Sequence, residues 1–156
     1  MANTYVQTSL LVPLTAEQQE YAEMVYNKLF EEGETPNEFQ EEILSDQDYP
    51  MPGFQCETEL DGIWLYDEEF VDIDALGSFI FHLVNKFKLE PVGFTWATTC
   101  SKPRLDEFAG GAVVVSQKEG VQVKTEEALV FFYRDLYHRK DAKTRKDLRS
   151  CDPVTP

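Results

Sequence analysis

Basic side chains are almost missing from the first half of this 156-residue chain. Residues 1–75 contain 19 acidic side chains and one basic one, Lys28, whereas residues 76–156 contain 10 acidic and 13 basic side chains. The formal net charge is −15 at pH 7. A surface of this charge repels the phosphates of nucleic acid and attracts basic proteins, so we expect no direct nucleic-acid binding. An acidic surface also keeps a small protein soluble, and that explanation requires no partner.

Cysteine is scarce, and long apolar runs are lacking. Cys56, Cys100 and Cys151 are odd in number and widely spaced, which argues against a disulfide framework and against a Cys-x-x-Cys metal or redox site. No apolar run reaches the roughly 18 to 20 residues that span a bilayer. The first residues lack the basic flank and apolar core of a signal peptide. We therefore expect a cytoplasmic protein with no membrane partner.

The apolar pattern predicts a single α+β domain over residues 1–150 and a frayed tail over residues 151–156. Periods of two and of 3.6 residues distinguish its strands from its helices. The expected order is a strand over 4–12, a helix over 15–32, a short helix over 37–44, a hairpin over 54–66, a helix from 72 or 74 to 88, a strand over 92–99, a hairpin over 112–124 and a helix from 125. Because hairpins pair antiparallel, we expect a largely antiparallel sheet of about five or six strands, with about three helices packed mainly on one face.

Particular residues predict where these elements begin, turn and pack. Thr15 and Gln18 have the spacing of a capping box. Asp61-Gly62 is suited to a type I′ turn, in which both central residues have positive φ. Two of the helices have a clear apolar face. The faces consist of Ile73, Leu76, Phe79, Ile80, Leu83, Val84 and Phe87 in one helix, and of Leu129, Phe132, Tyr133, Leu136 and Tyr137 in the last.

The stretch TWATTCSKPRLDEFAGGAVVV, residues 95–115, places a thiol, a hydroxyl, two cations and a Gly-Gly pair between two apolar runs. It does not match a phosphate loop, because the glycines lead into a strand and no lysine follows them. A catalytic cysteine needs a neighbouring histidine, and His82 and His138 both lie on predicted helices. Two interpretations stay open: a hairpin connection whose glycines allow close backbone approach, and a ligand loop. The residues of the ligand loop are Cys100, Ser101, Lys102, Arg104, Gly110 and Gly111.

Two motifs carry a resemblance. The pattern Trp96-x-x-Thr99-Cys100-Ser101-Lys102-Pro103-Arg104, followed by Phe108-x-Gly110-Gly111-Ala112-Val113-Val114-Val115, resembles small uncharacterised proteins of bacteria and of their phages and plasmids. The stretch Gly62-Ile63-Trp64-Leu65-Tyr66-Asp67-Glu68-Glu69 is similar to their G-[IV]-W-x-Y-x-E-E stretch. The similarity covers residues 54–116, and Ala109 stands where such proteins often have glycine. It implies a setting in mobile elements and the bacterial cytoplasm, and it implies no mechanism.

A run of acidic residues connects the first predicted hairpin to the next helix. Its carboxylates are Asp67, Glu68, Glu69, Asp72 and Asp74. The helix dipole stabilises acidic groups at this position without any ion, and the EF-hand spacing is absent. We therefore predict no metal, no cofactor and no catalytic residue, and we favour a role other than that of an enzyme.

We interpret the protein as an acidic interaction protein that docks on the basic surface of a partner, such as a nuclease or a nucleic-acid-binding complex. Regularly spaced carboxylates compete with DNA phosphates for the same cations, so the specific hypothesis is a DNA mimic that inhibits a host nuclease or defence complex. The alternative is a small enzyme or ligand-binding domain that uses residues 99–111. We expect a monomer, or a homo-oligomer that salt dissociates. The proposed acidic surface consists of Glu34, Glu38, Glu41, Glu42, Asp46, Asp48, Asp67, Glu68 and Glu69.

Overall fold

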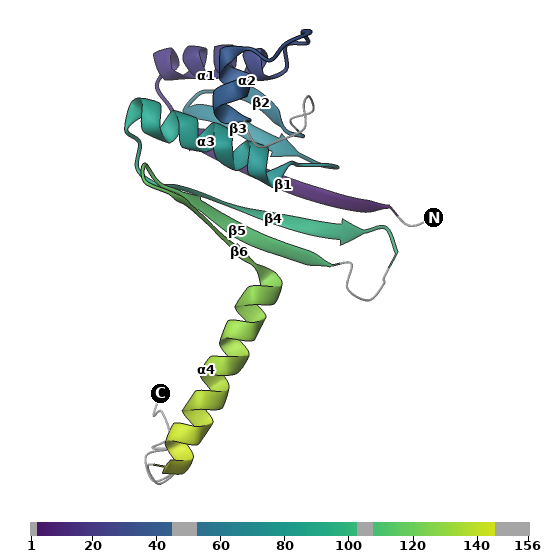
Figure 1. The fold of residues 1–156 in the computed structure, drawn as a ribbon, viewed down its shortest axis with the longest axis vertical. Helices are drawn as coiled ribbons and strands as arrows, with labels where there is room; N and C mark the ends of the chain where they lie inside the picture. The colour runs from purple at the N-terminus through teal and green to yellow at the C-terminus, as the bar shows by residue number, and fades with distance from the viewer. Residues whose placement is uncertain (1–2, 45–52, 103–107, 146–156) are drawn as a thin grey trace. The chain divides into compact units, whose positions relative to one another are not determined.

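A computed structural model describes residues 3–44, 53–102 and 108–145 of the chain. Contacts divide the chain into two units, Met1–Val123 and Lys124–Pro156, which we describe one at a time (Figure 1). The strands are β1 (Thr4–Pro13), β2 (Gln55–Glu59), β3 (Gly62–Asp67), β4 (Val92–Cys100), β5 (Ala109–Val115) and β6 (Gly120–Lys124). The helices are α1 (Ala16–Leu29), α2 (Glu38–Ile43), α3 (Ile73–Phe87) and α4 (Thr125–Arg145). Asp46, Asp48, Arg104 and the tail 151–156 lie outside the described residues.

The six strands form one sheet in the order β2-β3-β1-β4-β5-β6. The first strand lies in the interior, because β1 pairs antiparallel with β3 on one side and with β4 on the other. The pairs β2–β3 and β4–β5 are antiparallel as well. The prediction of an α+β fold with a largely antiparallel sheet is confirmed.

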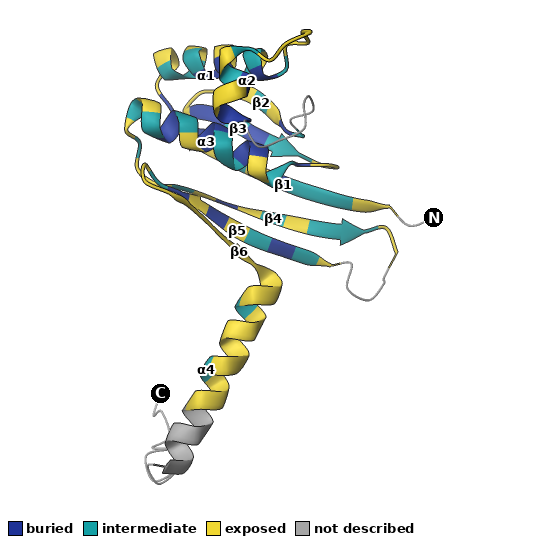
Figure 2. Cartoon of the chain, viewed as in Figure 1, coloured by how far each residue is buried: buried dark blue, intermediate teal, exposed yellow. Residues whose placement is uncertain are grey.

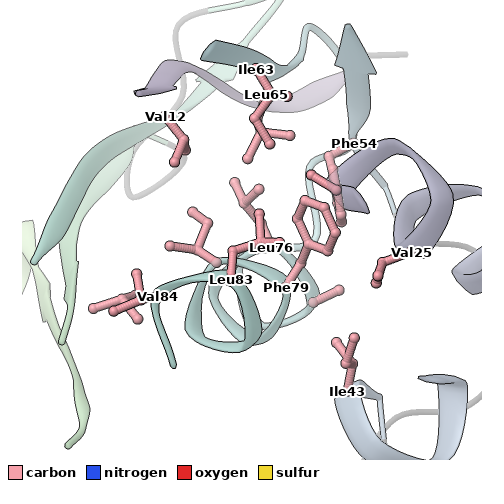
Figure 3. Packing of buried hydrophobic residues seen from close by; sticks show 14 of the residues in the cluster. Val12, Val25, Ile43, Phe54, Ile63, Leu65, Leu76, Phe79, Leu83 and Val84 are labelled. Atoms are coloured by element: carbon pink, nitrogen blue, oxygen red, sulfur yellow. The ribbon is translucent and has the colours of Figure 1, made fainter. Parts of the chain in front are cut away.

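The core lies between one face of this sheet and helices α1, α2 and α3 (Figure 3). Directly opposed residues of an antiparallel pair share a face, and Val12 opposite Ile63 and Phe94 opposite Val113 are all buried. From α3, Phe79 is fully buried and its ring lies 5.5 Å from that of Phe54. The other face of the sheet has no cover from these three helices, so the two faces differ in exposure (Figure 2).

The predicted helix starts are confirmed at atomic detail. Thr15 and Gln18 form a reciprocal capping box at α1. Asp72, rather than Asp74, caps α3, since its Oδ1 accepts hydrogen bonds from the backbone N–H groups of Asp74 and Ala75. Helix α1 ends at Leu29, three residues before the predicted end. At this end the side chains of Asn37 and Gln40 donate hydrogen bonds to the carbonyl oxygens of Lys28 and Leu29.

The predicted type I′ turn is wrong. Because Glu59 pairs with Gly62, the two-residue loop of the β2–β3 hairpin is Leu60-Asp61, and no glycine in the described ranges has a positive φ. Gly62 serves a different purpose. A Cβ atom at this position would lie 2.1 Å from the carbonyl oxygen of Val12, so glycine allows β3 to approach β1.

Helix α4 makes up most of the second unit. The segment predicted to carry an apolar face is helical, but the large apolar side chains of this helix are 52 to 73% exposed (Figure 2). Those side chains are Leu129, Val130, Phe131, Phe132, Tyr133, Leu136 and Tyr137. Within the described ranges, no helix has the length and apolar character that crossing a bilayer requires.

Candidate interaction surfaces

The outer face of α1 is acidic. Ala22, Val25 and Leu29 are buried, which turns Glu17, Glu20 and Glu23 outward, and all three are exposed. Three residues advance an α-helix by about 4.5 Å, so these carboxylates follow the helix at short, regular intervals. The sequence analysis assigned the acidic surface to other residues, and a helical-wheel comparison with the buried positions would have identified this face.

Helix α2 carries the next group of predicted acidic residues. Its Gln40 is 4% exposed, and Nε2 of this residue donates hydrogen bonds of 3.1 and 3.0 Å to the carbonyl oxygens of Leu29 and Glu31. This anchor leaves Glu38 and Glu41 exposed, and Glu34 is exposed in the preceding connection. The structure therefore places these three predicted residues at the surface, beside α1.

Glu42, the last of the predicted acidic residues on α2, lies beside His82. Its Oε1 lies 3.5 Å from Nδ1 of His82, and the hydroxyl of Tyr21 lies 3.0 Å from Nε2 of the same ring. The ring of Phe39 meets His82 edge-on at a centroid distance of 6.1 Å. Burial raises the pKa of Tyr21, and the negative charges of Glu42 and Glu38 raise it further. His82 of α3 thus contacts Tyr21 of α1 and both Phe39 and Glu42 of α2.

The acidic residues at the end of β3, Asp67, Glu68 and Glu69, have two different roles. Oδ1 of Asp67 accepts hydrogen bonds from the backbone N–H groups of Glu69 and Phe70, at 2.8 and 2.7 Å. That carboxylate therefore stabilises the turn. Glu68 and Glu69 have exposed side chains, while their carbonyl oxygens accept bonds from Gln7 and from the backbone of Val6.

Two aromatic residues of β3 lie on the sheet face opposite the core. The rings of Trp64 and Tyr66 stack at a centroid distance of 3.9 Å. The indole N–H of Trp64 donates to Oγ of Ser9 at 2.8 Å, and the hydroxyl of Tyr66 donates to Oε1 of Glu57 at 2.5 Å. The hydrogen bond to the Glu57 carboxylate is the main cause of a raised pKa at Tyr66. Alternation of these aromatics with the buried Ile63 and Leu65 is the sequence pattern that indicates their face.

The predicted ligand loop is largely built into the sheet. Ser101 accepts a hydrogen bond at Oγ from the backbone N–H of Asn3, and its own N–H donates to the Asn3 carbonyl, both at 2.9 Å. Cys100 ends β4 opposite Thr4 and is partly buried, whereas Lys102 is exposed. Gly110 is buried opposite Ala97 in the β4–β5 ladder.

Gly111 allows a close approach of three strands. A Cβ atom there would lie 2.6 Å from the carbonyl oxygen of Val123 and 2.8 Å from Nε1 of Trp96. The predicted reason for the Gly-Gly pair, close backbone approach, therefore holds at Gly111. Ser101 is therefore hydrogen-bonded to Asn3, and Gly110 and Gly111 lie in the β4–β5 ladder, as the hairpin interpretation expects.

A groove of about 560 Å³ lies between α3 and the β5–β6 hairpin. Gly77, Ser78 and Phe81 of α3 line one wall, and Val113 and Val115 of β5 lie at its floor. Three carboxylates line it, and lysine and arginine are absent from its described lining. These carboxylates are Glu42, Asp74 and Glu119.

Within the described ranges, no group of three or more His, Cys, Asp or Glu side chains has the arrangement of a metal site. No protein-family model, curated protein or solved structure matches this chain significantly.

Proposed function

We propose that this protein is an acidic interaction protein that docks on a basic partner surface through α1 and α2. One observation carries the proposal: these helices present a row of exposed carboxylates with few cations nearby. We define the acidic helical surface as Glu17, Glu20, Glu23, Glu34, Glu38 and Glu41.

Few basic residues lie near this surface in the sequence. Lys28 is the one basic residue of the first 75, and its Nζ forms an ion pair at 2.7 Å with Glu31, which lies outside the acidic helical surface. In the described part of the chain, none of the six carboxylates takes part in an ion pair. Their field is therefore available to an approaching cationic surface, and salt screens it over about 10 Å.

Carboxylates on the face of α1 follow one another at intervals comparable to the phosphate spacing of one DNA strand, about 3.4 Å. A basic groove that holds nucleic acid offers lysines and arginines at a matching density. The protein then acts as an inhibitor that competes with nucleic acid for that groove. The resemblance to proteins of phages and plasmids supports a host nuclease or defence complex as the target, in the bacterial cytoplasm.

The first experiment is a pull-down with the tagged full-length chain from nuclease-treated bacterial lysate, at low and at high salt. We expect a nuclease or nucleic-acid-binding complex that is retained at low salt, released at high salt and displaced by added DNA. A partner that is insensitive to both salt and DNA would show that the acidic helical surface does not mediate binding.

Two variants with equal changes in charge locate the surface. Glu20→Lys with Glu23→Lys reverses the centre of the α1 face, where lysine is as good a helix former as glutamate. Glu59→Lys with Glu90→Lys makes the same change in net charge at two exposed positions away from α1 and α2. We expect only the α1 pair to abolish capture. Equal loss in both pairs would mean that net charge, and not this surface, attracts the partner.

A further inference from the structure

Helix α4 has too much apolar surface to be stable in water by itself. Residues 128–133 read Ala-Leu-Val-Phe-Phe-Tyr, so apolar side chains surround the helix over its first turns. Seven large side chains between Leu129 and Tyr137 are at least half exposed. Helices that are apolar all round are normally buried, and exposed patches of this size mark interfaces. Something must cover α4.

The helix layer of the first unit has room for one more helix. Helix α1 contacts β2 and β3, and α3 contacts β4 and β5. Strands are spaced about 4.8 Å apart and a helix is about 10 Å wide, so each helix covers about two strands. Strand β6, Gly120–Lys124, is the last in the sheet order and is exposed along its whole length. The groove beside α3 marks that uncovered end.

Gly77 indicates what kind of element enters the groove. This residue lies inside α3, where glycine is destabilising by about 0.5–1 kcal/mol relative to alanine. A Cβ atom at this position would meet no atom within 4 Å, so no contact within the first unit requires glycine here. Gly77 and the neighbouring Ser78 are both small, so another helix can approach this wall of the groove closely. Phe81, 40% exposed one turn further, supplies an apolar contact.

Charge favours α4 as the occupant. The unit Met1–Val123 has a formal charge of −17, whereas Lys124–Pro156 has +2. The groove is lined by three carboxylates and by no described cation. After its apolar turns α4 becomes basic in sequence, with Arg134, Arg139, Lys140, Lys143 and Arg145. An apolar helix with a basic end complements an apolar groove with acidic edges.

The connection between β6 and α4 favours a groove in another molecule. Strand β6 ends at Lys124 and α4 begins at Thr125, with no residue between them. Connections that return a helix over its own sheet usually contain two to six residues. Without such a connection, the groove of a second copy is the accessible one.

We propose that the chain forms a dimer in which α4 of each copy occupies the groove between α3 and β6 of the other. The exchange is closed and symmetric, because each copy supplies one helix and one groove. Half-exposed side chains of this size bury on the order of 100 Å² each. The side chains on one face of α4 therefore remove about 500 Å² from each docked helix, and the groove walls lose a comparable area, so two docked helices reach the roughly 1,200–2,000 Å² of a stable interface. That face consists of Leu129, Phe132, Tyr133, Leu136 and Tyr137.

Two glycine substitutions test the groove directly by light scattering on the full-length chain. Gly77→Arg fills the groove with a bulky cation at a site where its Cβ has free space. Gly93→Arg is the matched control on the opposite sheet face, where a Cβ would make ordinary contacts of 3.6 Å. We expect wild type and Gly93→Arg to have the mass of a dimer and Gly77→Arg to have the mass of a monomer. Circular dichroism should show that Gly77→Arg is folded. A monomeric wild type, or a Gly77→Arg chain that remains dimeric, overturns the proposal.

A mixing experiment separates helix-in-groove exchange from simple pairing of two α4 helices. The chain Phe132→Asp with Leu136→Asp keeps its groove but loses the apolar surface of its helix. We expect this chain and Gly77→Arg each to be monomeric alone, and to form a one-to-one heterodimer when mixed, because one intact helix meets one intact groove. A mixture that stays monomeric overturns the proposal as well.

Discussion

The carbonyl oxygen of Val12 occupies the space that a side chain on Gly62 would need. A Cβ at that position would lie 2.1 Å from the oxygen, far inside contact distance. The two residues lie 50 positions apart, and they meet because β1 and β3 are neighbours in the sheet. A single glycine therefore controls how closely the first hairpin can join the central strand.

Gly62→Ala should destabilise the protein by about 1–3 kcal/mol, the typical cost of forcing atoms into a well-packed interior. Gly93→Ala provides the comparison, because its Cβ would meet Val113 and Val114 at an ordinary 3.6 Å. We expect that change to stay within about 0.5 kcal/mol of wild type. Urea denaturation measures both. Equal stability of the two variants would contradict the close approach at Val12.

Gln40→Leu should cost about 2–4 kcal/mol, because it leaves the carbonyl oxygens of Leu29 and Glu31 without their side-chain donor. The exposed neighbour Glu41 is the control, and Glu41→Gln should change stability by less than about 0.5 kcal/mol. Denaturant unfolding gives both values. If leucine at position 40 were tolerated as well as glutamine at 41, Gln40 would not anchor α2 to the end of α1.

Phe79→Ala should cost about 3–5 kcal/mol, as expected for a phenylalanine whose removal leaves a cavity. Its ring is fully buried and lies 5.5 Å from Phe54 and 6.3 Å from Tyr26. Phe81→Ala, on the exposed side of the same helix, should cost less than 1.5 kcal/mol in the monomeric Gly77→Arg background. Thermal unfolding monitored by circular dichroism distinguishes the two positions. A similar loss at both would mean that Phe81 is a core residue.

Alkaline pH should destabilise the fold through Cys56. Burial, with added repulsion from Glu23 and Glu57, raises the pKa of this thiol from its ordinary value of 9.0 to about 12. Above pH 9 the unfolded chain releases a proton that the folded chain retains, so stability falls as pH rises from about 9 to 12. The pKa of Tyr26, raised to about 12 chiefly by burial, adds to the same trend.

Cys56→Ala should reduce the loss of stability between pH 9 and 12. Part of the loss should remain, because Tyr26 still contributes. Urea midpoints between pH 8 and 11 provide the measurement. Identical slopes for wild type and Cys56→Ala would show that the thiol ionises alike in the folded and unfolded chains.

Local sequence was sufficient for the elements whose causes are local. The Thr15–Gln18 capping box, the cap at Asp72 and the apolar face of α3 involve residues within one or a few helical turns. The sheet class followed from the hairpins for the same reason, because neighbouring strands pair through short connections. Exposure of the acidic residues Glu34, Glu38 and Glu41 could likewise be expected from charge alone.

Only the tertiary structure decided the features that depend on distant residues. Trp64 meets Ser9 across 55 positions, and His82 meets Tyr21 across 61. Asp67 was predicted as part of a docking surface, but the fold makes it the acceptor that holds a turn. The groove beside Gly77 lies between α3 and the strands β5 and β6, which the sheet order places next to each other. Periodicity determines which side of a helix is apolar. The strand order arises from long-range pairing, and it determines whether a sheet surface lies against that apolar side.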